Sequence, residues 1–224
     1  MKAFVVDLDS SKNQIMLKSS VRSFNNQAHQ INEAAEKIHE LIKNAPYSND
    51  NIVLKRNEIK EAFFSPFKPQ LKNAQVFLSH SHADRNKALE VKNYLESQTK
   101  RKVFIDSLFW DYKDDVLNKL ARYDDTSKIE DAFTLILRES LQDMIEKCPY
   151  FVFLQSKNSV SNQGLSQITY SAWIYEELRI AHSISSESRL TILMESFQVS
   201  HDISLFLESF ETITLKKLSQ QINS

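Results

Sequence analysis

The first 45 residues carry apolar side chains at a helical period. Apolar positions alternate at steps of four and three from residue 17 to residue 45, and this spacing predicts one long helix with an apolar seam. The seam consists of Leu17, Val21, Phe24, Ala28, Ile31, Ala35, Ile38, Ile42 and Ala45, and Pro46 ends it. Two interpretations remain open: a helix packed on the body of its own chain, or a coiled coil or helical hairpin between chains.

A second helical segment and a pair of prolines follow the seam. Apolar residues predict a helix over residues 52–64, and Pro66 and Pro69 then close the region. From Ala74 onward the pattern changes to short continuous apolar runs separated by amphipathic stretches. We therefore expect two parts, an N-terminal helical region at residues 1–73 and a second domain at residues 74–224.

The second part alternates strand-like and helix-like stretches. Continuous apolar runs predict strands at 74–79, 102–106, 150–155, 189–195 and 211–215. Strands of this kind, separated by helices, indicate an α/β fold with a parallel five-stranded sheet covered on both faces. Ligands of such sheets bind beyond the carboxyl ends of the strands. Those ends include residues 79–84, 106–112 and 155–169, and Asp84 can cap the next helix.

One predicted helix, residues 170–182 with the sequence YSAWIYEELRIAH, carries a candidate functional pair. Ile174, Leu178 and Ala181 recur at helical steps and line one side. Trp173 and Glu177 lie four residues apart, so they share another face. A carboxylate beside a large aromatic ring is a plausible ligand-facing pair. On the pattern alone, however, Glu177 is more simply a solvated helix carboxylate.

Composition narrows the classes of function. The 224 residues carry a net charge of −1, so the overall charge does not favour nucleic acid or an anionic membrane as a partner. The single glycine, Gly164, excludes the glycine-rich loops that cradle nucleotide phosphates. The single cysteine, Cys148, excludes an internal disulfide and a zinc-binding thiolate cluster. No signal-like or membrane-spanning apolar run is present, so we expect a cytoplasmic setting.

Several stretches, in order, resemble a Toll/interleukin-1 receptor-like (TIR) domain. They are VFLSHSHAD (76–84), VFID (103–106), CPYFVFLQSKNSVS (148–161) and SAWIYEEL (171–178), and the match covers roughly residues 74–215. The last stretch is the most specific, because the family has a Ser-x-Trp-x-x-x-Glu-Leu helix at this place. The resemblance implies a flavodoxin-like sheet. Two features depart from the family: Ile174 replaces a cysteine, and the segment 107–127 is longer than usual.

The resemblance also implies an activity and a site. Many bacterial and plant TIR domains cleave NAD⁺ between nicotinamide and ribose, and Glu177 stands at the position of their catalytic glutamate. The neighbouring Glu176 is expected to be dispensable. Substrate-binding positions are expected in the loops and strand ends around Glu177. They are Ser79, His80, Asp106, Trp110 and Trp173, although core packing is the commoner role for a residue such as Trp173.

The chemistry of this cleavage suits a chain without metal or cofactor sites. The bond to nicotinamide is glycosidic, its transition state resembles an oxocarbenium ion, and a nearby carboxylate stabilises that charge. Nicotinamide leaves as a neutral molecule, so a single glutamate suffices, NAD⁺ is the substrate, and no cofactor is expected. The product is expected to be ADP-ribose, a cyclic isomer or a conjugate that signals to a separate effector.

The resemblance is to stand-alone bacterial TIR proteins, some of which act in anti-phage immunity. In related enzymes a loop of one subunit completes the pocket of the next, so self-association through TIR surfaces and through the apolar seam is expected. Two alternatives remain. The first is a TIR scaffold that binds other TIR domains without catalysis. The second is a zinc hydrolase built on His80, His82 and Asp84, in which Arg85 stands where the zinc motif has histidine.

Overall fold

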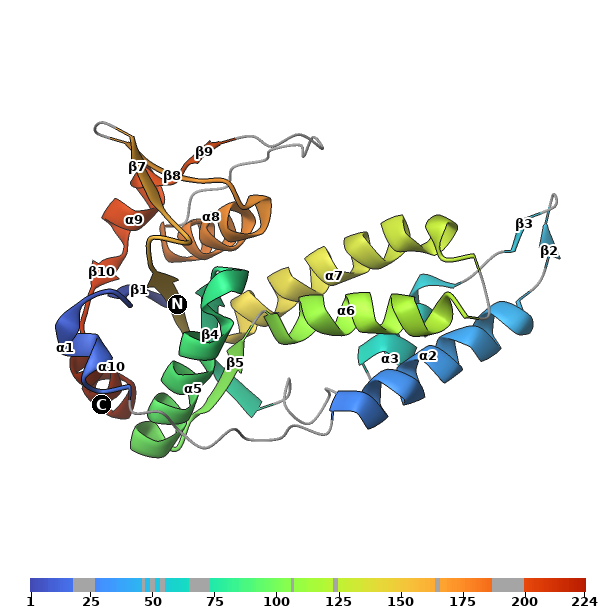
Figure 1. Cartoon of the computed structure of the whole chain (residues 1–224), viewed down its shortest axis with the longest axis horizontal. Helices are drawn as coiled ribbons and strands as arrows, with labels where there is room; N and C mark the ends of the chain where they lie inside the picture. The colour runs from blue at the N-terminus through green and yellow to red at the C-terminus, as the bar shows by residue number, and fades with distance from the viewer. Residues whose placement is uncertain are drawn as a thin grey trace. The chain divides into compact units, whose positions relative to one another are not determined.

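The computed structural model of the chain has two compact units. It describes residues 1–17, 27–45, 47–48, 51–52, 55–64, 73–105, 107–122, 125–163, 166–186 and 200–224, with backbone alone at 27–33, 47–48, 51–52, 63–64, 107–112, 127–129, 132 and 186. The sheet unit comprises residues 1–21, 73–107 and 141–224. The helical unit comprises residues 22–72 and 108–140. The elements of both units are labelled in Figure 1.

The sheet unit is built on five parallel strands in the order β10-β1-β6-β4-β5. These are β10 (Glu211–Thr212), β1 (Lys2–Asp7), β6 (Tyr150–Gln155), β4 (Ala74–His80) and β5 (Lys102–Ile105). Numbered by their appearance in the chain and read from the β5 edge, the five strands stand in the order 3-2-4-1-5. This differs from the flavodoxin-like order 2-1-3-4-5 in that the N-terminal strand β1 occupies the fourth place. The predicted α/β class with a five-stranded parallel sheet is therefore confirmed.

The N-terminal strand corrects the predicted division of the chain. We placed residues 1–73 outside the sheet, whereas β1 pairs with β6 from Lys2 to Asp7 and with β10 on its other side. Phe4, Val5 and Val6 are at most 2% exposed. A short apolar run of this kind is typical of a strand buried on both faces. The 189–195 run, which we expected in the sheet, lies outside the described residues, and the 211–215 run is a strand only at β10.

Helices cover both faces of the sheet. α5 (Arg85–Thr99) packs on β4 and β5 and also contacts α10 (Leu215–Asn223), whereas α8 (Ala172–Ser186) packs on β1 and β4. In Figure 1, α5 and α10 lie on one side of the strands and α8 on the other. Right-handed crossovers require this arrangement, because the chain moves in opposite directions across the sheet after β4 and after β6. The predicted helices on both faces are thus present.

A buried asparagine joins the end of β1 to α10. Asn13 lies in the single-turn helix α1 (Ser11–Gln14) and is 2% exposed. Its amide nitrogen donates to the carbonyl oxygen of Asp7 at 2.7 Å, and its amide oxygen accepts from the backbone nitrogen of Leu215 at 3.0 Å. Both hydrogen-bonding ends of the side chain are therefore satisfied, which allows the amide to be buried.

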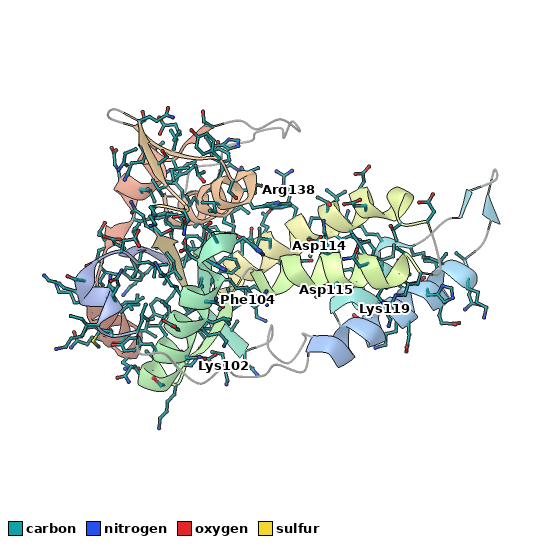
Figure 2. All side chains as sticks on the ribbon, in the orientation of Figure 1. Lys102, Phe104, Asp114, Asp115, Lys119 and Arg138 are labelled. Atoms are coloured by element: carbon teal, nitrogen blue, oxygen red, sulfur yellow. The ribbon has the colours of Figure 1, made fainter. Side chains whose placement is uncertain are left out.

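An aromatic layer forms the centre of the core. Phe77 stacks on Phe151 with ring centroids 5.7 Å apart, and its ring centroid lies 5.6 Å from that of Phe104. Phe210, which follows α9 (Ser204–Ser209), lies 5.8 Å from Phe151. On β5, Lys102 at the start of the strand is exposed and Phe104 is buried (Figure 2). These contacts join three adjacent strands through side chains on the same face.

The outer edge of β5 is covered by an ion pair from α5. The backbone nitrogen of Val103 donates to Glu96 Oε1 at 3.0 Å, and its carbonyl oxygen accepts from Lys92 Nζ at 3.0 Å. Lys92 and Glu96 also contact each other at 2.5 Å. Edge strands with unpaired backbone groups are templates for pairing with another chain. This ion pair therefore occupies backbone groups through which β5 could extend the sheet.

The Glu96→Ala variant is expected to self-associate more strongly than the wild type. The substitution frees the Val103 N–H at the sheet edge, which can then pair with a strand of another copy. Light scattering over a range of protein concentrations would measure the change in mass. Glu90→Ala, which removes a carboxylate elsewhere on α5, is the matched control. Equal masses for the wild type and Glu96→Ala at every concentration would contradict the expectation.

The helical unit contains α2 (Gln27–Lys43), α3 (Arg56–Phe64), most of α6 (Ser107–Leu120) and the first two thirds of α7 (Ser127–Lys147). A short hairpin of β2 (Tyr47–Ser48) and β3 (Asn51–Ile52) joins α2 to α3. Asp114, Asp115 and Lys119 lie along α6 and Arg138 lies on α7 (Figure 2). No helix was predicted over 107–120, yet Val116, Leu117 and Leu120 are buried at helical spacing.

The apolar seam is helical only in part. α1 ends at Gln14, residues 15–17 are not helical, and 18–26 lie outside the described residues. The expected single long helix is therefore wrong in its first part, because residues 15–17 interrupt it, whereas α2 confirms the pattern from 27 to 43. Ala35 and Ile38 are at most 1% exposed, and α2 contacts α3. The middle of the seam thus packs within the helical unit, and association between chains through the rest of the seam stays a prediction. Among the described helices, none has the length and apolarity to cross a bilayer.

Candidate active site

The carboxyl ends of three neighbouring strands form the candidate site. The chain runs from β4 to β5 in one direction across the sheet, and from β6 toward β10 in the other. The strand order therefore reverses between β4 and β6, and parallel sheets bind ligands beyond the strand ends at such a switch point. The segment after β4 and the loop after β6 meet there. β1 contributes the adjoining turn, because Leu8 N donates to Gln155 O at 2.8 Å.

Asp84 connects the two segments at the switch point. It is 2% exposed, accepts a hydrogen bond from the Ser156 hydroxyl at Oδ2, and accepts one from Asn158 Nδ2 at Oδ1 over 2.9 Å. We expected this carboxylate to cap the following helix. Asp84 does occupy the N-cap position of α5, but its side chain makes no capping bond. The expected capping bond is therefore wrong, because the side chain points to the loop after β6 instead.

The loop after β6, residues 156–160, uses its own backbone donors. Ser156 N donates to Ser159 Oγ at 2.8 Å, and Asn158 N donates to Ser156 Oγ at 3.0 Å. The nitrogens of Ser159 and Val160 donate to the Ser156 carbonyl. Glycine-rich loops bind phosphate by offering free N–H groups. In the described conformation this loop is held by hydroxyls and one carbonyl, so it does not act as a phosphate cradle.

The fifth donor of the loop binds the turn after β1. Lys157 N donates to Asp9 Oδ2 at 3.0 Å, and Lys87 Nζ lies 3.3 Å from Asp9 Oδ1. The bond from the Lys157 backbone is the largest cause that holds the pKa of Asp9 below its usual value; burial opposes it, and the bond and charge of Lys87 lower the pKa further. Asp9 thus stays ionised and ties the β1 turn to both the β6 loop and α5.

Glu177 lies on the buried face of α8. Its exposure is 0%, and Ile174, Leu178 and Ala181 on the same helix are at most 3% exposed. The sequence pattern placed Glu177 on a separate face shared with Trp173, which is half-buried, and interpreted the carboxylate alone as solvated. The assignment to a solvated face is wrong. A buried carboxylate costs folding free energy, and such groups cluster at functional sites.

Glu176 is engaged by a neighbouring arginine. Arg179 donates from Nε and Nη2 to the two carboxylate oxygens at 2.8 and 2.7 Å, which is a bidentate pair. The hydrogen bond to Glu176 raises the pKa of Arg179, with a smaller opposing effect of burial. Both oxygens of Glu176 are therefore used within one helical turn. Of the two adjacent glutamates, Glu176 has an evident role in holding α8 together.

Ser79 and His80 end β4 and are 0% and 3% exposed. Adjacent residues of a strand point to opposite faces, so only one of them faces α8. Ser79 lies on the same side as Phe77, whose stacking partner Phe151 contacts Phe210 after α9. Among the described residues, the Ser79 hydroxyl has no hydrogen-bond partner.

The other predicted site residues are placed less fully. Asp106 lies outside the described residues, and for Trp110 only the backbone, in α6, is described. Within the zinc alternative, His80 is buried, His82 is exposed, and Asp84 is bonded to Ser156 and Asn158. In the part of the chain that the structure describes, no three His, Cys, Asp or Glu side chains gather as metal ligands.

The outer face of α8 is held by a second small sheet, which the sequence did not indicate. Strands β7 (Ser161–Gln163), β8 (Ser166–Thr169) and β9 (His201–Asp202) pair antiparallel, and α9 follows. Tyr175 stacks on His201 with centroids 4.6 Å apart, and burial raises the pKa of Tyr175. His182 Nδ1 lies 2.9 Å from Ser209 Oγ, and its ring packs beside Phe206. The available signal in the sequence was that Tyr175 and His182, both aromatic and polar, lie seven residues apart and so share one face of the helix.

Cys148 is expected to resist thiol reagents in the folded protein. The side chain is fully buried before β6, and burial raises its pKa from 9.0 to about 12, with a small opposing effect of Lys147. The thiolate is the reactive form, so labelling at pH 8 should be absent until denaturant is added. Because the unfolded thiol ionises first, this group's contribution to stability is present below pH 9 and is lost as the pH rises toward 12. Rapid labelling of the native protein would contradict this.

Comparisons of the chain with models of protein families, with curated proteins and with solved structures found no match.

Proposed function

We propose that the protein cleaves NAD⁺ between nicotinamide and ribose, with Glu177 as the carboxylate that acts on the ribose. The observation that supports this most directly is the burial of Glu177 on the face of α8 that packs on β1 and β4. A helix on the surface of a sheet has no packing reason to bury a carboxylate there. The resemblance of SAWIYEEL (171–178) to the catalytic helix of TIR domains assigns the same residue this role.

The chemistry requires few groups. As nicotinamide leaves, positive charge develops on the ribose, and a carboxylate in a water-poor setting stabilises that charge more than it would in water. Glu177 would also accept hydrogen bonds from ribose hydroxyls, which strengthen as the charge develops. Nicotinamide departs neutral and needs no proton donor. Water or a second nucleophile then attacks C1′ of the ribose and loses a proton, which gives ADP-ribose or an ADP-ribose derivative.

The burial of Glu177 has a consequence for catalysis. A ribose cannot contact a carboxylate that is 0% exposed, so the reactive conformation differs from the described one around α8. We propose that assembly of several copies favours that conformation, as the resemblance to TIR enzymes implies, and that the product signals to a separate effector in bacterial anti-phage defence. Local opening at the active site is common in enzymes that exclude water during the reaction.

Nicotinamide release from NAD⁺ tests this function. The purified protein would be assayed over a wide range of concentrations, and mass spectrometry of the product would separate hydrolysis from cyclisation and conjugation. Release that rises more steeply than protein concentration would support both the activity and its dependence on assembly. No release at any concentration would favour the second candidate from the sequence, a TIR scaffold without catalysis.

A further inference from the structure

The hydrogen bonds that Asp84 accepts connect the end of β4 to the loop after β6 at the candidate site. Its carboxylate is buried and carries two hydrogen bonds, from the Ser156 hydroxyl and the Asn158 amide. Both donors are neutral and both belong to the loop after β6, whereas Asp84 itself follows β4. Hydrogen bonds to a charged acceptor are among the stronger ones in proteins. The two segments that border the switch point are therefore joined by one side chain.

The loop held by Asp84 leads directly to the catalytic helix. From residue 160 the chain continues through β7 and β8 into α8, which carries Glu177. The position of residues 156–160 therefore sets where β7, the first element on the way to α8, begins. Four of the five backbone donors of the loop bond within it and fix its shape, the fifth bonds Asp9, and Asp84 fixes the place of the loop relative to β4. The loop is preorganised as a unit, and Asp84 anchors that unit.

We propose that Asp84 is a positioning residue, which sets the loop at 156–160 against the end of β4 and so forms the rim on which the dinucleotide binds. This inference rests on the proposed use of NAD⁺ as substrate. Asp84 is 2% exposed and both of its carboxylate oxygens accept bonds from the loop, so in this proposal it acts through the loop and not on the reacting atoms. Its loss should therefore weaken binding of NAD⁺ and leave the chemical step at Glu177 largely unchanged.

A merely structural role predicts a different kinetic signature. A variant that only unfolds in part lowers the concentration of active enzyme, so its apparent kcat falls while KM is unchanged. A displaced rim raises KM, and the enzyme that does bind substrate reacts at a near-normal rate. Asp84→Ala is expected to raise KM about tenfold, in line with the loss of hydrogen bonds to a charged group, with kcat within about threefold of wild type.

Graded variants and a matched control make the test specific. Asn158→Ala removes one of the two bonds at an exposed position, and Asp84→Asn keeps the shape and one acceptor. Both should give KM values between those of wild type and Asp84→Ala. Thr99→Ala is the control, since Thr99 is a buried side chain that bonds Leu95 O and Arg101 N between α5 and the amino end of β5, at the opposite end of the strands. It should lower the melting temperature with KM unchanged.

Binding measured without turnover separates this inference from the proposed function. Calorimetric titration of NAD⁺ into Glu177→Gln, with and without Asp84→Ala, gives Kd values that do not require activity. An unchanged Kd and KM in the Asp84 variants of an active enzyme would overturn the inference and leave the function standing. If the wild type releases no nicotinamide but Asp84→Ala still weakens the binding of NAD⁺ tenfold, the rim is supported and the catalytic role of Glu177 is overturned. No binding of NAD⁺ by the wild type would overturn both.

Discussion

Replacement of Glu177 by glutamine is expected to reduce nicotinamide release by at least about a hundredfold. The amide has nearly the shape of the carboxylate but no negative charge, so it does not stabilise the positive charge that develops on the ribose. The measurement is the rate of nicotinamide release at saturating NAD⁺. Because the change acts in the transition state, kcat should fall far more than KM rises.

The same variant is expected to remain folded. Glutamine has nearly the shape and volume of glutamate, so the packing of α8 is retained at this position, which is 0% exposed. Circular dichroism should give the spectrum of the wild type and a cooperative thermal transition. Loss of that transition would mean that the fall in nicotinamide release reflects unfolding and not the chemical step.

Glu176→Gln is the matched control, because it makes the same chemical change one residue earlier. Glu176 forms the bidentate pair with Arg179. Its replacement weakens that pair, so Tm should fall while nicotinamide release at lower temperature persists. Release that survives in Glu177→Gln, or that is lost equally in both variants, would contradict the assignment of catalysis to Glu177.

The elements predicted correctly from the sequence are those with strong local patterns. β4, β5 and β6 are continuous apolar runs, and α8 repeats apolar residues at helical steps. β1 has the same kind of run, yet its partner begins at Tyr150, far along the chain. Pairing between distant segments leaves no local signal. The run was excluded from the sheet because the proline-marked boundary and the start of the resemblance both lie near residue 74.

The sequence predicted where the candidate site lies, but not which side chains contact one another there. Parallel topology placed it at the strand ends, which is where Asp84 and the loop after β6 meet. The residues next to Asp84 in the sequence suggested a helix cap. Its actual partner, Ser156, is 72 positions away, so no local pattern could indicate it. Glu177 was assigned to a solvated face because charged residues are rarely buried. Its burial depends on how α8 is placed, and that follows from the packing of β9 and α9 on its outer face.

Loss of β1 is expected to unfold the sheet unit. β1 is bonded to β6 along its whole length and to β10 on its other side, and its centre is buried on both faces. Val5→Asp places an unpaired charge in this core and should cost about 4–5 kcal/mol or more, a large share of the stability of an ordinary domain. Chemical denaturation followed by circular dichroism would measure the loss. Lys2→Asp, at the exposed start of the same strand, should have little effect.

This expectation changes how self-association through the N-terminal region should be tested. Deletion of residues 1–45 removes the apolar seam, but it also removes β1, so a loss of oligomers would follow from unfolding alone. A sounder test keeps β1 and replaces Ile42, a half-exposed seam residue of α2, by lysine. Cooperative unfolding of a protein that lacks residues 1–9 would contradict the role of β1.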